Sequence, residues 1–355
     1  MISMKPTTII KLSLPRVFLL MACLLAGICL APSEALFAQE GEQWITYEPA
    51  EGPGNGKHIV LISGDEEYRS EEALPMLGKI LARRYGFKAT VLFAIDPETG
   101  EIDPDIQTNI PGLHTLQTAD LMVIFTRFRE LPDEQMTYIV EYINAGKPVV
   151  GLRTATHAFR YERNPDSPYA HYAFNSAGRA WADGFGRQIL GETWIDHHGA
   201  HGREGTRGVV DGVMKRQNHA ILRGVEDIWG PSDVYGTRQL AGDAQVLVWG
   251  LSTEGMTPDS PVQWEQTAMP VAWIKHYTSG EGNTGRVFTS TMGASVDLES
   301  EDLRRLVING CFWAIGMDRQ IPEETNVDYV GEYHPTMFGF DNYRRGLVPS
   351  HFAIQ

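Results

Sequence analysis

Three polar segments of the chain hold residue types that could perform acid–base chemistry on a small molecule. They span residues 64–72, 127–129 and 153–157, and their candidate side chains are Glu66, Glu67, Tyr68, Arg69, Arg127, Arg153, Thr154 and His157. Guanidinium groups keep neighbouring carboxylates ionised, and an imidazole beside them can take a proton from a substrate or return one. Arginines can also hold an oxygen on which negative charge builds during a reaction.

We expect His157 or Glu67 to carry the proton, and Arg69 and Arg153 to complete the catalytic set. The candidates for binding the substrate are Glu66, Tyr68, Arg127, Thr154, Trp194 and His219. Trp194 is included because it lies near the polar segments and an aromatic face can pack against a substrate. A structural interpretation competes, in which Arg153 forms an ion pair, His157 is a packing residue and the glutamates lie on the solvated surface.

A second cluster lies at residues 196–201, which read Asp-His-His-Gly-Ala-His. Asp196, His198 and His201 offer carboxylate and imidazole ligands, which suit zinc or a similar divalent metal. Adjacent histidines on a strand point to opposite faces, so at most one of the pair at 197 and 198 would join a shared site unless the segment is a loop. The spacing matches no established zinc motif, and a polar loop with hydrogen-bonded histidines is the alternative.

Buried strands must position these segments. Short apolar runs at residues 58–63, 88–93, 121–126 and 148–150 predict four strands, and the apolar spacing at 74–85 and 132–143 predicts helices between them. Strands that alternate with helices form a parallel sheet with right-handed crossovers. Ligands bind at the carboxyl ends of such strands. All three polar segments are therefore expected at one edge of the sheet.

The second half of the chain predicts a more mixed arrangement. Short strand candidates separated by turn residues lie between residues 209 and 291. Ser300 is a suitable N-cap for a last helix, which ends before Gly316. We expect one α/β domain over residues 57–318, followed by an irregular C-terminal arm at 319–355.

The N-terminus has the plan of a secretory signal peptide, because three basic residues precede the apolar run at 17–31 and small residues follow it. We expect residues 1–38 to be the signal peptide and 39–56 a linker, in a secreted or periplasmic protein without stable membrane association. An uncleaved anchor is the alternative, although the run is short for a membrane span. Cys311 is the one cysteine outside this segment, so no intrachain disulfide is expected.

The charge of the chain bears on its partners. Its formal net charge is -15, and an acidic surface repels phosphate backbones and anionic lipid. Nucleic acid is therefore not expected as a partner, and a neutral or cationic small molecule or a metal ion is a better candidate.

The order of the segments resembles the ThuA-like (trehalose-utilisation) family, whose fold is that of the class I glutamine amidotransferases. The resemblance covers roughly residues 57–318 and is carried by the spacing of eight segments: Gly64 to Glu72, Ala119 to Val123, Ala145 to Arg153, Asn218 to Ile221, Ser232 to Tyr235, Pro270 to Trp273, Gly285 to Gly293 and Asn309 to Gly316. It implies a flavodoxin-like parallel sheet flanked by helices, with added mixed β segments in the second half.

The resemblance also implies carbohydrate metabolism and a small-molecule carbohydrate as partner, with acid–base processing of oxidised (3-keto) sugars as the most concrete activity. Thr154 stands at the bend where an amidotransferase carries its nucleophilic cysteine, so glutaminase activity is not expected. Ser70 and Ala294 also replace histidines that are common in the family. Two other functions stay open: a non-catalytic sugar-binding or scaffold module, and a metal-dependent hydrolase.

Overall fold

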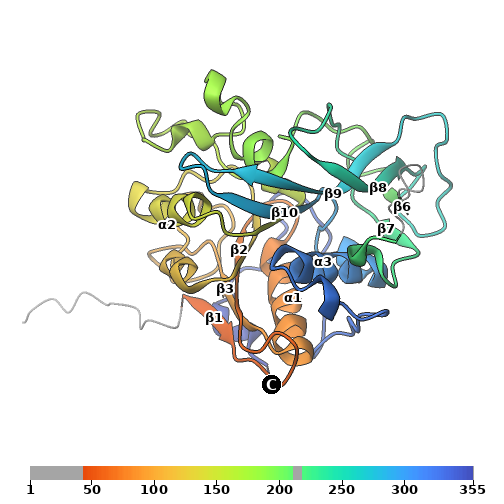
Figure 1. The fold of residues 1–355 in the computed structure, drawn as a ribbon, viewed down its shortest axis with the longest axis horizontal. Coiled ribbons are helices and arrows are strands. Elements are labelled where there is room, and N and C mark those ends of the chain that lie inside the picture. Colours follow the sequence, from red (N-terminus) through yellow and green to blue (C-terminus); the bar gives the residue numbers. More distant parts are fainter. Residues whose placement is uncertain (1–42, 211–217, 355) are drawn as a thin grey trace, which may run out of the picture. The chain divides into compact units, whose positions relative to one another are not determined.

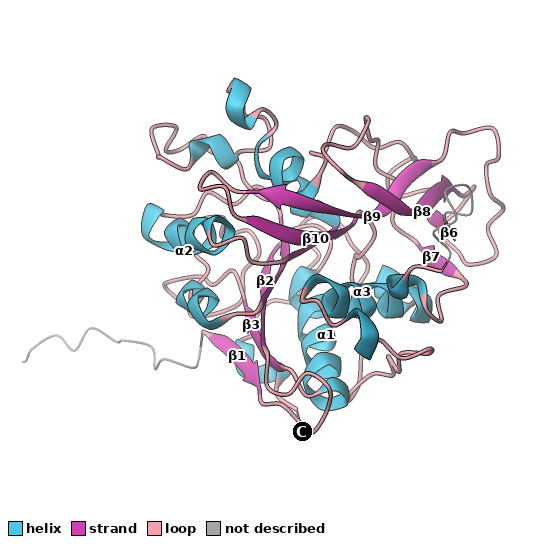
Figure 2. Ribbon diagram, in the orientation of Figure 1, coloured by secondary structure: helices cyan, strands magenta, loops and turns pink. Residues whose placement is uncertain are grey.

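The structure is a computed structural model that describes residues 43–210 and 218–354, so the signal peptide expected at 1–38 lies outside the described residues. Within these ranges the strands form one ten-stranded sheet in the order β1-β3-β2-β4-β5-β10-β9-β8-β6-β7 (Figures 1 and 2). The strands are β1 (Trp44–Tyr47), β2 (His58–Gly64), β3 (Lys88–Leu92), β4 (Leu121–Thr126), β5 (Val149–Leu152), β6 (Thr206–Val210), β7 (Ile228–Gly230), β8 (Gln245–Ser252), β9 (Met269–Thr278) and β10 (Thr284–Ser290).

The first half of the sheet is the expected parallel unit. Strands β3, β2, β4 and β5 pair in parallel, and β10 continues the parallel set on the far side of β5. Helix α1 (Ser70–Tyr85) connects β2 to β3, and α2 (Asp133–Asn144) connects β4 to β5. The predicted α/β class, with helices flanking a parallel sheet, is confirmed. Residues 44–47, inside the segment expected as a linker, form the edge strand β1, which pairs antiparallel with β3.

Two cores cover the two faces of this sheet. In β2, Ile59 and Leu61 pack into one core with α1 and α3 (Glu301–Ala314), whereas Val60 and Ile62 pack into the other with α2. Successive residues of a strand point to opposite faces, so a strand that is buried on both faces must be apolar throughout. The Ser300 hydroxyl accepts a hydrogen bond from the Leu303 amide and caps α3, as the sequence predicts.

The second half extends the sheet in antiparallel fashion. Strand β9 pairs with β10 on one side and β8 on the other, and β6 and β7 complete the edge. These are the added mixed β segments that the sequence predicts. Among the described residues, no helix is long and apolar enough to cross a membrane.

The C-terminal arm returns to the first half of the chain. The side chains of Arg84 and Tyr85, at the end of α1, donate hydrogen bonds to backbone carbonyls of the arm. The acceptors are the carbonyls of Asn326, Asp328 and Tyr329. The arm then reaches the β1 edge, where the hydroxyl of Tyr47 donates to the carbonyl of Phe352 over 2.8 Å. Between these two anchors it passes the carboxyl edge of the sheet.

Candidate functional site

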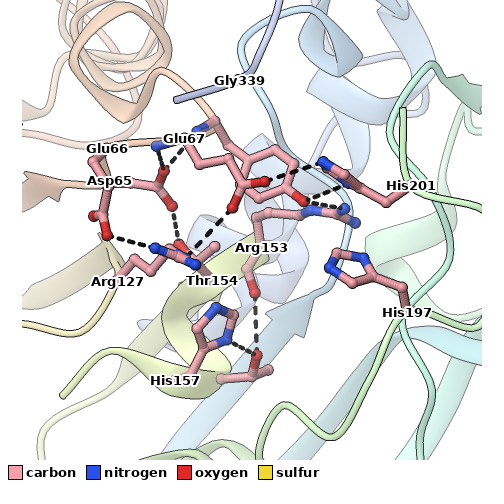
Figure 3. A network of polar contacts seen from close by, with 12 residues as sticks. Asp65, Glu66, Glu67, Arg127, Arg153, Thr154, His157, His197, His201 and Gly339 are labelled. Carbon is pink, nitrogen blue, oxygen red and sulfur yellow. Dashed lines mark hydrogen bonds and ion pairs between the residues drawn. The ribbon is translucent and has the colours of Figure 1, made fainter. Parts of the chain in front are cut away.

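The three polar segments meet at the carboxyl ends of β2, β4 and β5, where direct contacts join them. The Arg127 amide donates to the Gly64 carbonyl over 2.8 Å, and the Phe128 amide donates to the His157 carbonyl over 3.0 Å. The hydroxyl of Thr154 hydrogen-bonds to the carboxylate of Asp65. The parallel register of the strands thus brings side chains from residues 65, 127 and 154 into one cluster (Figure 3).

Backbone conformation is unusual at each of the three segments. Arg69, Phe128 and Arg153 have φ values of 60°, 51° and 43°, in the left-handed region that non-glycine residues seldom occupy. Such residues cost free energy and persist where the surrounding contacts hold them. Phe128 and Arg153 lie where the chain leaves β4 and β5, whereas Arg69 is the N-cap of α1.

The acidic segment divides into buried and pocket-facing carboxylates. Asp65 is fully buried and accepts hydrogen bonds from the amides of Glu67 and Tyr68 over 2.7 and 2.6 Å. Glu66 is held by two guanidinium groups, at 2.5 Å from Arg127 Nη1 and 2.6 Å from Arg129 Nη2. Both carboxylates therefore fix the loop.

Glu67 is the carboxylate of this segment that faces the pocket. Its Oε2 atom lies 3.4 Å from Arg127 Nε, and its Oε1 atom lies 3.2 Å from His201 Nε2. The small pocket next to it is lined by Glu67, Arg127, Phe128, His157, Trp194, His197 and Tyr235. Four of these side chains, at positions 67, 127, 157 and 194, are among the residues singled out from the sequence.

Arg153 and Arg69 lie behind the pocket rather than in its wall. The buried guanidinium of Arg153 donates to Asp233 Oδ1 over 2.9 Å and to the carbonyls of Asp233 and Thr291. It packs between the rings of Tyr68 and Tyr235, 4.4 and 3.8 Å from their centroids.

The guanidinium of Arg69 donates to the carbonyls of Glu66 and Gly339. The contacts of both arginines are those of positioning residues.

The second half of the chain contributes a histidine pair and an aspartate that the sequence did not single out together. His197 Nδ1 lies 2.7 Å from Asp233 Oδ2, and His201 Nδ1 lies 3.1 Å from Asp233 Oδ1. An isolated antiparallel bridge between His197 and Tyr235 holds this region. Figure 3 shows both imidazoles beside Arg153, on the side of the cluster away from Glu66.

The remaining predicted residues lie outside this cluster. Asp196 is exposed, and the His198 imidazole is not part of the group formed by His197, His201 and Asp233. His219 caps the short helix Ala220–Leu222, where its ring accepts from the Ile221 amide and lies against Trp313.

Electrostatics set His157 and His201 apart. Burial, together with Arg127 and Arg153, holds the pKa of His157 well below its ordinary value, so this imidazole is neutral at pH 7. Hydrogen bonds to Asp233 and Glu67 raise the pKa of His201 to about 9, so it is a cation at pH 7. Although burial opposes ionisation of Asp233, Arg153 and the two histidines lower its pKa. The cluster thus holds a neutral imidazole at His157 and a protonated imidazole at His201, which is paired with Glu67.

The ligand atoms of His197, His201 and Asp233 all lie within 4.8 Å of one another, and these residue types bind divalent metals. The carboxylate of Asp233, however, already accepts from the fully buried guanidinium of Arg153. A divalent cation bound to Asp233 would lie beside that positive charge, which is unfavourable. The set fits a hydrogen-bonded acid–base cluster better than a metal centre.

Comparisons with known proteins give a family match and similar solved structures. A family model described as ThuA, trehalose utilisation, matches residues 60–314. A ThuA-like protein from Bacteroides uniformis is 13% identical, with a TM-score of 0.47 and coverage of 77% of this chain and 96% of its own. A ThuA-like protein from Parabacteroides merdae is also 13% identical, with a TM-score of 0.45 and coverage of 81% and 98%. No curated protein matches the chain.

Proposed function

Because this chain belongs to the ThuA (trehalose utilisation) family, we propose that it is an enzyme that carries out acid–base chemistry on a carbohydrate, with an oxidised (3-keto) sugar as substrate. The observation that carries this proposal is that the neutral imidazole of His157 lines one small pocket with the carboxylate of Glu67 and the guanidinium of Arg127. A base and a cation side by side suit the removal of a proton next to a ketone.

His157 is the proton acceptor in this proposal. Its Nδ1 atom lies 3.2 Å from the hydroxyl of Thr156, which orients the ring, and the ring lies 5.4 Å from that of Trp194. A neutral imidazole can accept a proton, whereas one that is already protonated cannot. The low pKa keeps His157 in the accepting form at neutral pH.

Arg127 holds the oxygen of the substrate ketone. When the proton leaves the carbon next to the carbonyl, the electron pair of that C–H bond forms a carbon–carbon double bond and the carbonyl oxygen becomes an enolate. A guanidinium stabilises this oxygen more strongly than the neutral ketone, and the barrier falls accordingly. Glu66 and Glu67 keep Arg127 in place through ion pairs of 2.5 and 3.4 Å.

The test is exchange of the proton next to the ketone. The protein would be incubated in heavy water with the 3-keto form of methyl glucoside, and loss of the C2 proton signal would be followed by nuclear magnetic resonance. We expect exchange with the wild-type protein and a loss of about 100-fold or more in His157→Ala, the contribution of a general base. His276→Ala is the matched control, because His276 is an exposed histidine paired with Asp243.

The outcomes separate the alternatives. Exchange that survives His157→Ala would contradict the role given to this residue. Binding of the keto sugar without exchange or turnover would favour a non-catalytic sugar-binding module.

Release of the protein from the cell into the medium or periplasm, with cleavage near residue 38, is a further expectation that follows from the N-terminal sequence.

A further inference from the structure

The C-terminal arm contacts the acidic segment that carries Glu67. The amide of Gly339 donates to the carbonyl of Glu67 over 2.8 Å, and the guanidinium of Arg69 donates to the carbonyl of Gly339. Three residues earlier, Thr336 is held by the carboxylate of Glu72 through its amide and hydroxyl, at 2.7 and 2.9 Å. Figure 3 shows Gly339 next to the acidic segment. The arm is therefore fixed on the loop that carries Glu67.

The two phenylalanines on either side of Gly339 have opposite environments. Phe338 is 7% exposed, and its ring lies 5.3 Å from that of Tyr68 and 5.7 Å from that of His201. Phe340 is 55% exposed, with its ring centroid 5.0 Å from the guanidinium carbon of Arg127. Phe338 therefore anchors the arm, whereas Phe340 keeps a free face next to a residue of the pocket wall.

Phe340 is not the only exposed apolar side chain of this segment. Met337, three residues earlier, is 46% exposed, so two of the five large apolar side chains that are exposed in the described ranges belong to this short segment. Exposed apolar side chains that form a patch beside a pocket can mark a binding surface. Phe340 makes no contribution to the core that would otherwise account for an aromatic side chain there.

We propose that the exposed face of Phe340, next to Arg127 at the pocket, is a stacking subsite for the ring that is linked to the reacting sugar. The proposal rests on the proposed function and specifies its substrate class: a glycoside, with a second sugar or an aromatic aglycone, in preference to a free monosaccharide. In this proposal the reacting ring lies over the mouth of the small pocket that His157 and Glu67 line. The linked ring then extends along the arm, where an aromatic face can pack against it.

The test compares two probes that differ in the linked group alone: the 3-keto forms of methyl glucoside and of 4-nitrophenyl glucoside. Calorimetry measures their binding to the wild-type protein and to Phe340→Ala, Phe340→Tyr and Trp264→Ala. Trp264 is the matched control, because it is an aromatic side chain with 75% exposure in the second half of the chain. We expect Phe340→Ala to weaken binding of the nitrophenyl probe about fivefold to tenfold, the worth of one aromatic contact.

The methyl probe should bind Phe340→Ala within about twofold of the wild type, and Phe340→Tyr should restore the nitrophenyl probe, since a tyrosine ring stacks as well. Equal effects on both probes, or none on either, would overturn the subsite. A changed oligomeric state of Phe340→Ala in sedimentation would also overturn it, because the residue would then serve self-association.

If wild-type exchange of the C2 proton persists while the probes show no difference, the subsite fails and the proposed function stands. If both probes bind without exchange, the acid–base proposal fails and the binding comparison still decides the subsite.

Discussion

His201 and Glu67 join the two halves of the chain at the candidate site, with the Nε2 atom of the imidazole 3.2 Å from the Oε1 atom of the carboxylate. The other ring nitrogen lies 3.1 Å from Asp233. The loop behind β2 and the antiparallel half of the sheet therefore meet through one imidazolium. Two carboxylates on opposite sides of the ring favour its charged form, which is why its pKa is about 9.

The first prediction concerns this contact. Glu67→Gln replaces one of the two carboxylates by a neutral amide, so the pKa of His201 should fall towards its ordinary value while remaining above it, because Asp233 still faces the ring. Titration of the imidazole signals by nuclear magnetic resonance would measure this. Glu98→Gln, at an exposed glutamate, is the control. An unchanged pKa of His201 in Glu67→Gln would mean that the two side chains do not interact in solution.

The second prediction concerns the buried pair of Arg153 and Asp233, whose side chains are both fully buried. Arg153→Met would leave the Asp233 carboxylate without its main counter-charge in a site of low polarity. The free energy of unfolding should fall by about 3–5 kcal/mol, the usual result of removing one partner from a buried ion pair. Urea denaturation would measure the change.

Arg160→Met provides the matched control for this experiment. Arg160 pairs with Glu162 at the surface, with side chains 40% and 59% exposed, and exposed pairs contribute about 0–1 kcal/mol. If Arg153→Met costs no more than Arg160→Met, the buried pair is not what holds Asp233 in place.

The third prediction concerns metal content. Because Arg153 already neutralises Asp233, we expect purified protein to contain well below one equivalent of zinc or any other divalent metal, and proton exchange to persist in the presence of a chelator. Elemental analysis of the protein gives the first quantity directly. One equivalent of metal that is lost in His201→Ala would contradict the acid–base interpretation and restore the metal-dependent hydrolase as the better function.

Much of the parallel half could be predicted from the sequence, because its signals are local. Continuous apolar runs marked β2, β3, β4 and β5, and a parallel sheet places the ends of such strands at one edge. That rule was enough to predict that the segments carrying Glu67, Arg127 and His157 meet, and all three side chains line one pocket. It said nothing about which polar side chains at the edge point into the pocket.

The contribution of the second half could not be predicted in this way. Asp233 lies 80 residues after Arg153 in the chain, and it reaches the site through an antiparallel arrangement whose register has no local signal. Of the two adjacent histidines, His197 faces Asp233 in the structure, whereas His198 was the one chosen from the sequence. Which of the two would do so depends on a single bridge to Tyr235 that the sequence does not reveal.

The last prediction concerns Glu71, a buried glutamate of the first turn of α1, next to the site. Among the described residues neither of its carboxylate oxygens has a hydrogen-bond partner, and the closest cation, Arg69, is 3.9 Å away. Burial raises the pKa of Glu71 to about 8, so the folded protein keeps this carboxyl protonated at neutral pH. The unfolded chain releases the same proton near pH 4.5.

Between these two values the folded state binds more protons than the unfolded state, so the stability that Glu71 contributes is complete below about pH 4.5 and is lost as the pH rises towards 8. Glu71→Gln keeps a neutral side chain of the same size at every pH. Its free energy of unfolding should therefore rise relative to the wild type by roughly 2 kcal/mol or more between pH 5 and pH 9. Urea denaturation at both pH values, with the exposed Glu98→Gln as control, would measure this difference. Parallel pH profiles for wild type and Glu71→Gln would show that the carboxyl is ionised in the folded protein and that water or a partner reaches it.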